Sequence, residues 1–493
     1  MVHSKFQLDI FNEVENGDSN IVISAVAGSG KTTTIEECLN IIPHKSDAIY
    51  LAFNNTIVDE MKNRLRNTTT LITTMHSFGW KSIMRHTNFK ANLNKSKSYK
   101  YIEIVLKKNN IKDEKLKSYY FYMMSNMLDL IRQNLISDFD EIIQLGIKYD
   151  FLLAEPDVMM ISETLSMMNK DKKDYDFTDM IYRVVIDKMK LPKYDFIFVD
   201  ESQDLSKCQQ QIVSKIKKIN GRMIAVGDPK QAIYGFAGSD NNSYNNLKHM
   251  FDNTVELPLS VNYRCGKEIV KEAQKINPQI LPAPKAKNGI VRNGFVTEII
   301  NSDWVLCRNL KPLVQLNLFL LDKKIKSYIK GYDIGMGLIR VLDKSSKSRV
   351  ENVLKSYENE IYKEMVKMKK NGIKNPKNSE KIDNMNQKLE ILKILSKDLL
   401  FTVDLIKRIK QIFKESGEGV MLSTIHKSKG LENHRIFFLL PNLIPNQFAT
   451  QAWQLEQENN LLYVAITRAK NELIYINEDE FKPVKDKIKE LMK

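Results

Sequence analysis

The chain has 493 residues, and 75 Lys and Arg against 60 Asp and Glu give a net charge of +15. A hydrophobic content of 43% predicts packed globular domains, about three by size, and excludes a disordered chain. The apolar runs are shorter than a membrane span and the N-terminus lacks a secretion signal, so we expect a soluble, intracellular protein without a membrane partner.

The excess of basic residues favours polyanions such as nucleic acid, although solubility alone also explains it. Four cysteines without a CxxC pair predict free structural thiols in a reducing compartment, rather than disulfides or a zinc cluster. The Lys-rich runs at 86–118 and 343–397 are compatible with solvated helix faces or with surfaces that guide DNA.

Apolar runs that end in polar turns mark the expected strands. A sheet covered on both faces needs runs of this continuous apolar kind, and their alternation with helical patterns predicts two α/β domains. The runs of the first domain are IVISA (21–25), AIYLAF (48–53), DFIFVD (195–200) and MIAVGD (223–228), and those of the second are SDWVLCR (302–308), EGVMLSTI (418–425), RIFFLL (435–440) and ELIYIN (472–477).

Two segments interrupt this alternation. Residues 86–176 carry Met, Leu and Ile at helical spacing, which predicts a helical insertion in the first domain. A second insertion, 343–414, contains two charged helical runs around NGIKNPKN (371–378), whose Gly and Pro predict a hairpin loop. The Pro-rich stretch 277–289 indicates a boundary.

The segment AVAGSGKT (25–32) follows an apolar run and precedes a helical pattern, which is the order of a P-loop, although Ala25 replaces the first glycine. Gly28 and Gly30 let backbone N–H groups surround phosphates at a helix N-terminus. Lys31 reaches the β- and γ-phosphates, and the Thr32 hydroxyl is a Mg²⁺ ligand. The candidate nucleotide-binding residues of this loop are Ala27, Gly28, Ser29, Gly30, Lys31, Thr32 and Thr33.

Carboxylates that could bind the metal follow the run DFIFV. Asp200 and Glu201 come at the carboxyl end of this predicted strand, where open α/β sheets bind ligands. We expect Asp200 to hold Mg²⁺ and Glu201 to act as general base for the attacking water.

Arg264 and Arg468 are candidates to stabilise the transferring phosphoryl group. Spacing alone does not indicate this role, and general surface statistics favour surface salt bridges for both arginines. The segment VGDPKQAIYGFAGS (226–239) places an amide, Gln231, and two rings, Tyr234 and Phe236, just beyond a predicted strand. Without further context, core packing is favoured over a surface role for these rings, because aromatic residues are usually buried.

Ordered sequence blocks across both α/β domains resemble superfamily 1 helicases of the UvrD/Rep/PcrA type. Some blocks are also similar to the helicase part of F-box DNA helicases. The blocks are FQLDIF (6–11), AVAGSGKT (25–32), LAFNNTIVDEM (51–61), TMHSFG (74–79), DFTDMI (176–181), VDESQD (199–204), VGDPKQAIYGFAGS (226–239), LPLSVNYR (257–264), MLSTIHKSKGLE (421–432) and LLYVAITRAK (461–470).

The resemblance implies an α/β fold with two RecA-like, parallel-sheet P-loop NTPase domains and helical insertions, with ATP bound between the two domains. The expected divisions are motor domain 1A at 1–85 and 177–262, insertion 1B at 86–176, motor domain 2A at 263–342 and 415–493, and a reduced 2B-like insertion at 343–414.

It also implies roles for single residues at the nucleotide. Gln7 would recognise adenine and Tyr263 would stack on it, while Glu432 would contact the ribose. Gln231, Arg264 and Arg468 would approach the γ-phosphate.

Single-stranded DNA would contact both domains. The positions that match the DNA-contacting blocks of the family are Phe53, Asn54, Asn55, His76, Tyr234, Phe236, His426 and Lys427. We read the two histidines as phosphate or backbone contacts, and their spacing excludes a metal site.

Some positions depart from the family pattern. Thr33 stands where relatives often carry an arginine packed on adenine, and Ala237 replaces an arginine that follows the stacking ring. The 2B-like insertion is shorter than in relatives.

The expected function is that of an ATP- and Mg²⁺-dependent DNA helicase that translocates 3′ to 5′ on single strands and unwinds duplex in replication, repair or recombination. Its expected partners are single-stranded DNA and junctions of single and double strands, with replication or repair proteins as further candidates, and we expect a monomer. We expect a cytoplasmic location in a bacterium, phage or virus, and a nuclear one in a eukaryote. The alternatives are a translocase that strips proteins from single strands and an inactive helicase-fold scaffold.

Overall fold

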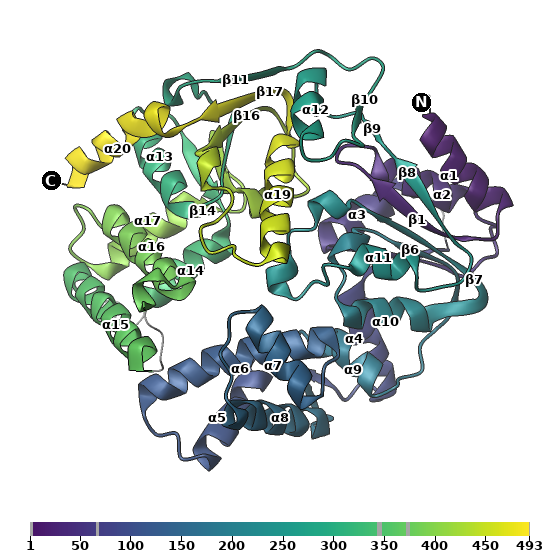
Figure 1. Cartoon of the computed structure of the whole chain (residues 1–493), viewed down its shortest axis with the longest axis horizontal. Coiled ribbons are helices and arrows are strands. Elements are labelled where there is room, and N and C mark those ends of the chain that lie inside the picture. The colour runs from purple at the N-terminus through teal and green to yellow at the C-terminus, as the bar shows by residue number, and fades with distance from the viewer. Residues whose placement is uncertain (1–2, 66–68, 343–347, 371–374, 493) are drawn as a thin grey trace. The chain divides into compact units, whose positions relative to one another are not determined.

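The computed structural model describes residues 3–65, 69–342, 348–370 and 375–492. The chain divides into two compact units, an N-terminal unit, Met1–Val261, and a C-terminal unit, Asn262–Lys493 (Figure 1). Each unit contains one large parallel sheet, which confirms the predicted α/β fold class.

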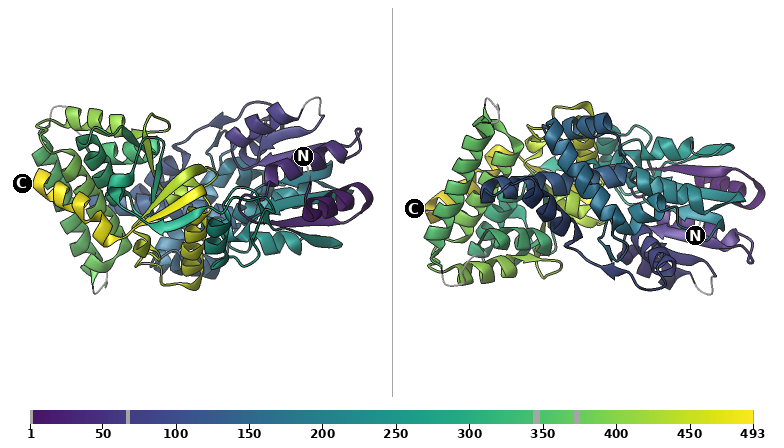
Figure 2. Two further views of the ribbon diagram at one scale, coloured as in Figure 1. Left: turned by 90° about the horizontal axis from the view of Figure 1, so that it is seen from above. Right: turned by 90° about the horizontal axis from the view of Figure 1, so that it is seen from below.

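The N-terminal unit is built on a six-stranded sheet with the order β3-β2-β6-β7-β1-β8. Every neighbouring pair in it is parallel. Along β1, Val22 packs into one hydrophobic cluster, while Ile21 and Ile23 pack into another, so helices cover both faces of the sheet (Figures 1 and 2). The strands are β1 (Asn20–Ala25), β2 (Ala48–Ala52), β3 (Leu71–Thr74), β6 (Tyr194–Val199), β7 (Lys217–Gly227) and β8 (Thr254–Leu259).

Helices connect these strands. They are α1 (Lys5–Asn16), α2 (Lys31–Ile41), α3 (Asn55–Arg64), α4 (Met75–His86), α9 (Asp179–Ile186), α10 (Lys207–Ile216) and α11 (Ser243–Lys248), with short 3₁₀ turns at Ser202–Asp204, Pro229–Gln231 and Gly235–Ala237. The α2 helix begins directly after the loop that follows β1, as a P-loop requires.

A helical insertion separates α4 from α9 and is drawn in blue in Figure 1. Helix α6 buries Met123, Met127 and Ile131 at a helical spacing, and these residues join the same hydrophobic cluster as Val22 of the sheet. The insertion is therefore packed on the core of the N-terminal unit. Its elements are β4 (Asn92–Leu93), α5 (Lys97–Lys108), α6 (Glu114–Asn134), α7 (Phe139–Lys148), α8 (Glu155–Lys170) and β5 (Asp174–Tyr175).

The C-terminal unit contains a seven-stranded sheet with the order β11-β17-β16-β12-β15-β13-β14, again parallel throughout. The strands are β11 (Ile290–Asn293), β12 (Trp304–Cys307), β13 (Ser327–Lys330), β14 (Phe413–Lys414), β15 (Val420–Thr424), β16 (Asn433–Leu439) and β17 (Ala469–Ile476). Val305 of β12 and Phe437 of β16 pack with Leu313 and Phe481 of the covering helices.

The remaining elements of this unit are mostly helical. They are β9 (Val261–Asn262), α12 (Lys267–Gln274), β10 (Leu281–Pro282), a 3₁₀ turn at Val296–Glu298, α13 (Leu310–Asp322), α14 (Tyr332–Leu342), α15 (Val350–Lys370), a 3₁₀ turn at Pro376–Asn378, α16 (Glu380–Leu395), α17 (Thr402–Ile412), α18 (Ile425–Ser428), a 3₁₀ turn at Pro441–Leu443, α19 (Ala452–Ile466) and α20 (Glu478–Met492).

Helices α15, α16 and α17 form the second insertion, in which Tyr357 and Ile361 of α15 pack on Ile382 and Leu389 of α16. Residues 371–374 of the predicted hairpin loop lie outside the described residues. All four cysteines are buried free thiols, as their spacing predicts. In the described part of the chain, no helix combines the length and the apolar character of a membrane span.

Candidate functional site

The loop between β1 and α2 forms the first part of the site. Gly30 adopts a left-handed conformation with φ +82° at the N-cap of α2, where a residue with a side chain would be strained. Among the described residues, no side chain caps this helix end, so its first N–H groups and its dipole favour an anion. Ser29 is fully buried, and its hydroxyl has no hydrogen-bond partner among the described residues. Ala25 belongs to β1, so its methyl group lies in the sheet core and not in the loop.

Lys31 meets the acidic end of β6. Its Nζ lies 3.1 Å from Glu201 Oε1, and Glu201 Oε2 accepts a hydrogen bond of 2.6 Å from Gln203 Nε2. Glu201 has a φ of +47°, an unusual conformation for a residue with a side chain, which turns the chain sharply at the end of the strand. The P-loop lysine and the predicted general base are thus in direct contact.

Asp200 is buried beside this pair. It accepts hydrogen bonds of 2.8 Å from the Tyr50 hydroxyl and from the Glu201 backbone N–H. Burial, followed by the negative charge of Glu201, raises the pKa of Asp200 to about 6, although Lys31 and Tyr50 oppose the rise. A bound cation would favour the ionised form of this carboxyl.

A hydrogen-bonded chain joins Glu201 to Gln231. Gln203 donates to Glu201, and its Oε1 accepts from the Asp228 N–H at 3.0 Å. Asp228 Oδ2 in turn accepts from Gln231 Nε2 at 2.7 Å. Burial raises the pKa of Asp228. Gln203 and Asp228 were not among the predicted site residues, although both lie within the quoted blocks at strand ends.

Gln7 lies beside the P-loop. It forms a capping box with Ser4 at the start of α1, and its Nε2 donates to Thr34 Oγ1 at 3.2 Å. Thr34 donates to the Gly30 carbonyl at 3.0 Å.

The donor set fits a nucleotide with Mg²⁺. The buried hydroxyl of Ser29 and the uncapped helix end suit phosphate, and Thr32 and Asp200 offer the oxygen ligands that Mg²⁺ prefers. The described residues contain no group of three or more His, Cys, Asp or Glu that could hold a metal ion. A Mg²⁺ ion that is held mainly by phosphates and water needs only one or two protein ligands.

The C-terminal unit gathers the second set of predicted nucleotide residues. Arg264 forms an ion pair with Glu432, whose other oxygen lies 2.8 Å from Lys470 Nζ. Burial disfavours the ionised form of Glu432, but Arg264 and Lys470 outweigh burial and lower its pKa. Arg468 is buried and donates to the carbonyls of Leu431 and Val464 at 3.0 and 3.1 Å.

Tyr263 precedes Arg264 in the chain, and its ring is 48% exposed. Arg264 also donates to the Thr467 carbonyl at 3.1 Å, next to Arg468. The structure therefore places Tyr263, Arg264, Glu432 and Arg468 in one region of this unit.

A group of three rings on the N-terminal unit consists of the exposed Phe53 and Phe236 and the half-buried Tyr234. Phe53 and Tyr234 stack, with centroids 5.8 Å apart and ring planes 13° apart. Tyr234 and Phe236 are 6.3 Å apart at 59°. Phe236 is 58% exposed and Phe53 is 45% exposed, so the alternative that Phe236 is a core residue is wrong.

A second exposed ring stacks on a predicted DNA contact. Phe177, which is 60% exposed, lies over His76 with a centroid distance of 4.1 Å and an interplanar angle of 16°. Phe177 lies within the block DFTDMI (176–181), but the sequence does not indicate a role for it, because it does not show which residue lies beneath the ring.

The remaining predicted DNA contacts have varied surroundings. Asn54 caps α3 through a bond from the Ile57 N–H, and Asn55 is exposed in the first turn. Lys427 forms an exposed pair with Asp333 at 2.7 Å.

The two histidines are neutral near pH 7. Burial lowers the pKa of His76 to about 4, and burial together with Arg308 lowers the pKa of His426 to about 3.

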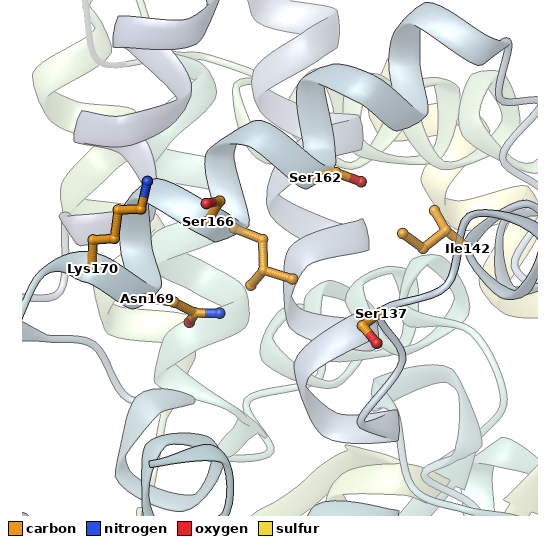
Figure 3. A pocket seen from close by; sticks show the side chains of 7 residues that line it. Ser137, Ile142, Ser162, Ser166, Asn169 and Lys170 are labelled. Atoms are coloured by element: carbon orange, nitrogen blue, oxygen red, sulfur yellow. The ribbon is translucent and has the colours of Figure 1, made fainter.

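A separate hollow of about 410 Å³ lies between α7 and α8 of the first insertion (Figure 3). It is lined by Ser137, Ile142, Ser162, Leu165, Ser166, Asn169 and Lys170, none of which is a predicted site residue.

The parallel sheets, the P-loop and the acidic strand end define the class of P-loop NTPases. Residues 8–252 match the UvrD/REP helicase N-terminal domain, and residues 419–476 match the UvrD-like helicase C-terminal domain. The chain belongs to the UvrD/Rep-type superfamily 1 helicases.

Relatives extend this result. F-box DNA helicase 1 of Gallus gallus is 24% identical over 94% of this chain and 48% of its own length. F-box DNA helicase protein 1 of Schizosaccharomyces pombe is 26% identical over 57% of this chain and 34% of its own length. The chain therefore spans half or less of these two relatives.

ATP-dependent DNA helicase Rep of Buchnera aphidicola is 23% identical over 94% of this chain and 93% of its own length. That alignment covers 615 positions, more than the 493 residues of this chain, so Rep has segments that the chain lacks.

Proposed function

We propose that this protein is an ATP- and Mg²⁺-dependent DNA helicase that translocates 3′ to 5′ on single-stranded DNA and unwinds duplex DNA. One observation carries the proposal. A single short segment connects the candidate catalytic residues to exposed rings. Gln231 is linked to Glu201 through Asp228 and Gln203. The half-buried Tyr234 packs on the exposed rings of Phe53 and Phe236. Hydrolysis of the γ-phosphate near Gln231 would thereby alter how tightly the aromatic rings bind a DNA base.

The catalytic roles follow from the contacts. In the proposed mechanism Lys31 exchanges its contact with Glu201 for the β- and γ-phosphates, which frees the Glu201 carboxylate to accept a proton from the attacking water. Thr32 and Asp200 would hold Mg²⁺, which supplies charge neutralisation at the phosphates when it is bound. Arg264 and Arg468 are the proposed contacts that stabilise the transferring phosphoryl group.

The exposed rings support binding to single strands of any sequence. Base–aromatic stacking contributes about 1–3 kcal/mol per base and does not discriminate between bases. Phe53, Tyr234 and Phe236 form one proposed stacking site, and Phe177 with His76 forms another. Because His76 is neutral, it would act by stacking and hydrogen bonding and would add no dependence on salt.

The test of the nucleotide site is Lys31→Ala, with the exposed Lys45→Ala as the matched control. We expect phosphate release in the presence of single-stranded DNA to fall by at least about 100-fold in Lys31→Ala only, since the phosphates lose a preorganised cation. DNA binding without nucleotide should persist in both variants. Hydrolysis near the wild-type rate in Lys31→Ala would refute the site.

A second candidate is a translocase that displaces proteins and unwinds little duplex. The compact α15–α17 insertion and the segments of Rep that the chain lacks favour this candidate. Displacement of a bound protein from a single strand, compared with unwinding of a bare duplex, separates the two functions.

A further inference from the structure

The first insertion contacts a loop that carries two of the proposed stacking rings. The aromatic loop, residues 234–238, contains Tyr234 and the exposed Phe236. The hydroxyl of Tyr149, at the C-cap of α7, donates to the Gly235 carbonyl at 3.0 Å. Burial and the nearby Asp240 raise the pKa of Tyr149 to about 12, so this hydroxyl stays protonated and remains a donor near neutral pH.

Helix α6 also lies beside this loop. Gly238 has a φ of +92°, and a Cβ at this position would approach Gln133 Oε1 to 2.7 Å. The side chain of Gln133 therefore lies directly against the loop, next to the position where Tyr149 binds it.

The residue before Gln133 contacts the other proposed stacking element. The acidic loop, residues 176–179, carries Phe177 between two buried carboxylates. Arg132 Nη1 lies 2.8 Å from both oxygens of Asp176 and 3.2 Å from Asp179, and Lys97 Nζ lies 2.6 Å from Asp179. These ions are almost completely buried, so their geometry is fixed by mutual pairing.

We infer that Tyr149 and Arg132 are positioning residues, through which the first insertion sets the aromatic loop and the acidic loop in the geometry that binds single-stranded DNA. This inference rests on the proposed function. Neither residue needs to touch DNA, because each acts through a loop that presents an exposed ring. The insertion thereby contacts both proposed stacking elements.

The most direct test is Tyr149→Phe, which removes one hydroxyl and keeps the ring. Tyr101→Phe is the matched control, because Tyr101 lies in the same insertion and its hydroxyl donates to Asp171 at 2.9 Å and not to the aromatic loop. We expect Tyr149→Phe to raise the apparent Kd for an oligo(dT) strand by about 3- to 10-fold, the effect of one hydrogen bond. Tyr101→Phe should leave the Kd unchanged, and the melting temperatures of the two variants should agree.

A double-mutant cycle distinguishes positioning from a general loss of structure. If Tyr149 acts through Phe236, Tyr149→Phe has no further effect on the Kd in a Phe236→Ala background. An unchanged Kd in Tyr149→Phe, or an equal loss in both backgrounds, would overturn the inference. A wild-type Kd in Phe236→Ala alone would instead remove the stacking role in the proposed function, so the two failures are distinguishable.

The same design applies to the acidic loop. Arg132→Lys keeps the charge but cannot reproduce the guanidinium geometry, in which Nη1 binds both Asp176 and Asp179 while Nη2 binds Asp129. Arg183→Lys is its control, because Arg183 is equally buried but binds Asp187 and main-chain carbonyls. We expect the Kd for oligo(dT) to rise for Arg132→Lys and not for Arg183→Lys. The comparison requires that the two variants lower the melting temperature by similar amounts. Equal effects of the two variants on the Kd would overturn the role of Arg132.

Discussion

Tyr50 is one of the groups that favour the ionised form of the proposed metal ligand, Asp200. Its hydroxyl is buried and donates to Asp200 Oδ2 at 2.8 Å, which favours the ionised carboxylate. Tyr50→Phe removes this donor and keeps the packing of the ring. A hydrogen bond to a charged group contributes about 1.5–3 kcal/mol, and about 1.4 kcal/mol corresponds to one pKa unit. The pKa of Asp200 should therefore rise from about 6 by roughly 1–2 units in the variant.

The direction of the change in ATP hydrolysis depends on which form of Asp200 binds Mg²⁺. Only the carboxylate of Asp200 binds Mg²⁺ well, so hydrolysis should be lost as pH falls through the pKa of this group. The assay is kcat/KM for ATP over about pH 5 to 9 at constant Mg²⁺, because this parameter reports ionisations of the free enzyme. In the plot of kcat/KM against pH, we expect the acid limb of Tyr50→Phe to lie at higher pH than that of the wild type. Added Mg²⁺ should shift this limb back to lower pH.

Tyr182→Phe is the control, because the Tyr182 hydroxyl accepts from Asn169 in the first insertion and makes no contact with Asp200. Its acid limb should match that of the wild type. Coincident acid limbs for wild type and Tyr50→Phe would refute the reasoning, since they would show that Asp200 ionisation does not limit hydrolysis.

Other changes test separate parts of the site. Phe236→Ala should bring the DNA-stimulated ATPase rate close to the DNA-free rate, and unchanged stimulation would remove the stacking role. Phe177→Ala should raise the Kd for oligo(dT) by about 5- to 100-fold, as expected for one lost stacked base, and an unchanged Kd would exclude Phe177 from the DNA surface. Arg264→Ala should lower hydrolysis by at least about 100-fold, measured as phosphate release, and it also deprives Glu432 of an ion-pair partner. Removal of Mg²⁺ with a chelator should abolish hydrolysis, and activity that persists would contradict the role of Thr32 and Asp200.

The sequence predicts the sheet centres better than their edges. The runs that form β1, β2, β6 and β7 are continuously apolar because both faces of these strands are buried. The edge strands β3 and β8 were not predicted. One is only four residues long, and the other contains a glutamate and a proline, as edge strands often do.

The individual site residues could be proposed from motif spacing, but their partners could not. The Lys31–Glu201 contact joins residues that are 170 positions apart, and the stacking of Phe177 on His76 depends on how α4 and α9 pack. The burial of Arg132 and Lys97 was equally hidden, because charged residues on helical patterns usually face solvent. Only the fold brings these groups together.

The most direct test of the central claim is strand displacement with ATP and Mg²⁺ on one duplex that carries either a 3′ or a 5′ single-stranded tail. A motor that moves 3′ to 5′ on the tail strand predicts unwinding from the 3′ tail and none from the 5′ tail. Unwinding from the 5′ tail only would contradict the proposed direction. A lack of unwinding from both tails, with ATPase that still rises on single-stranded DNA, would contradict the helicase activity and favour the translocase.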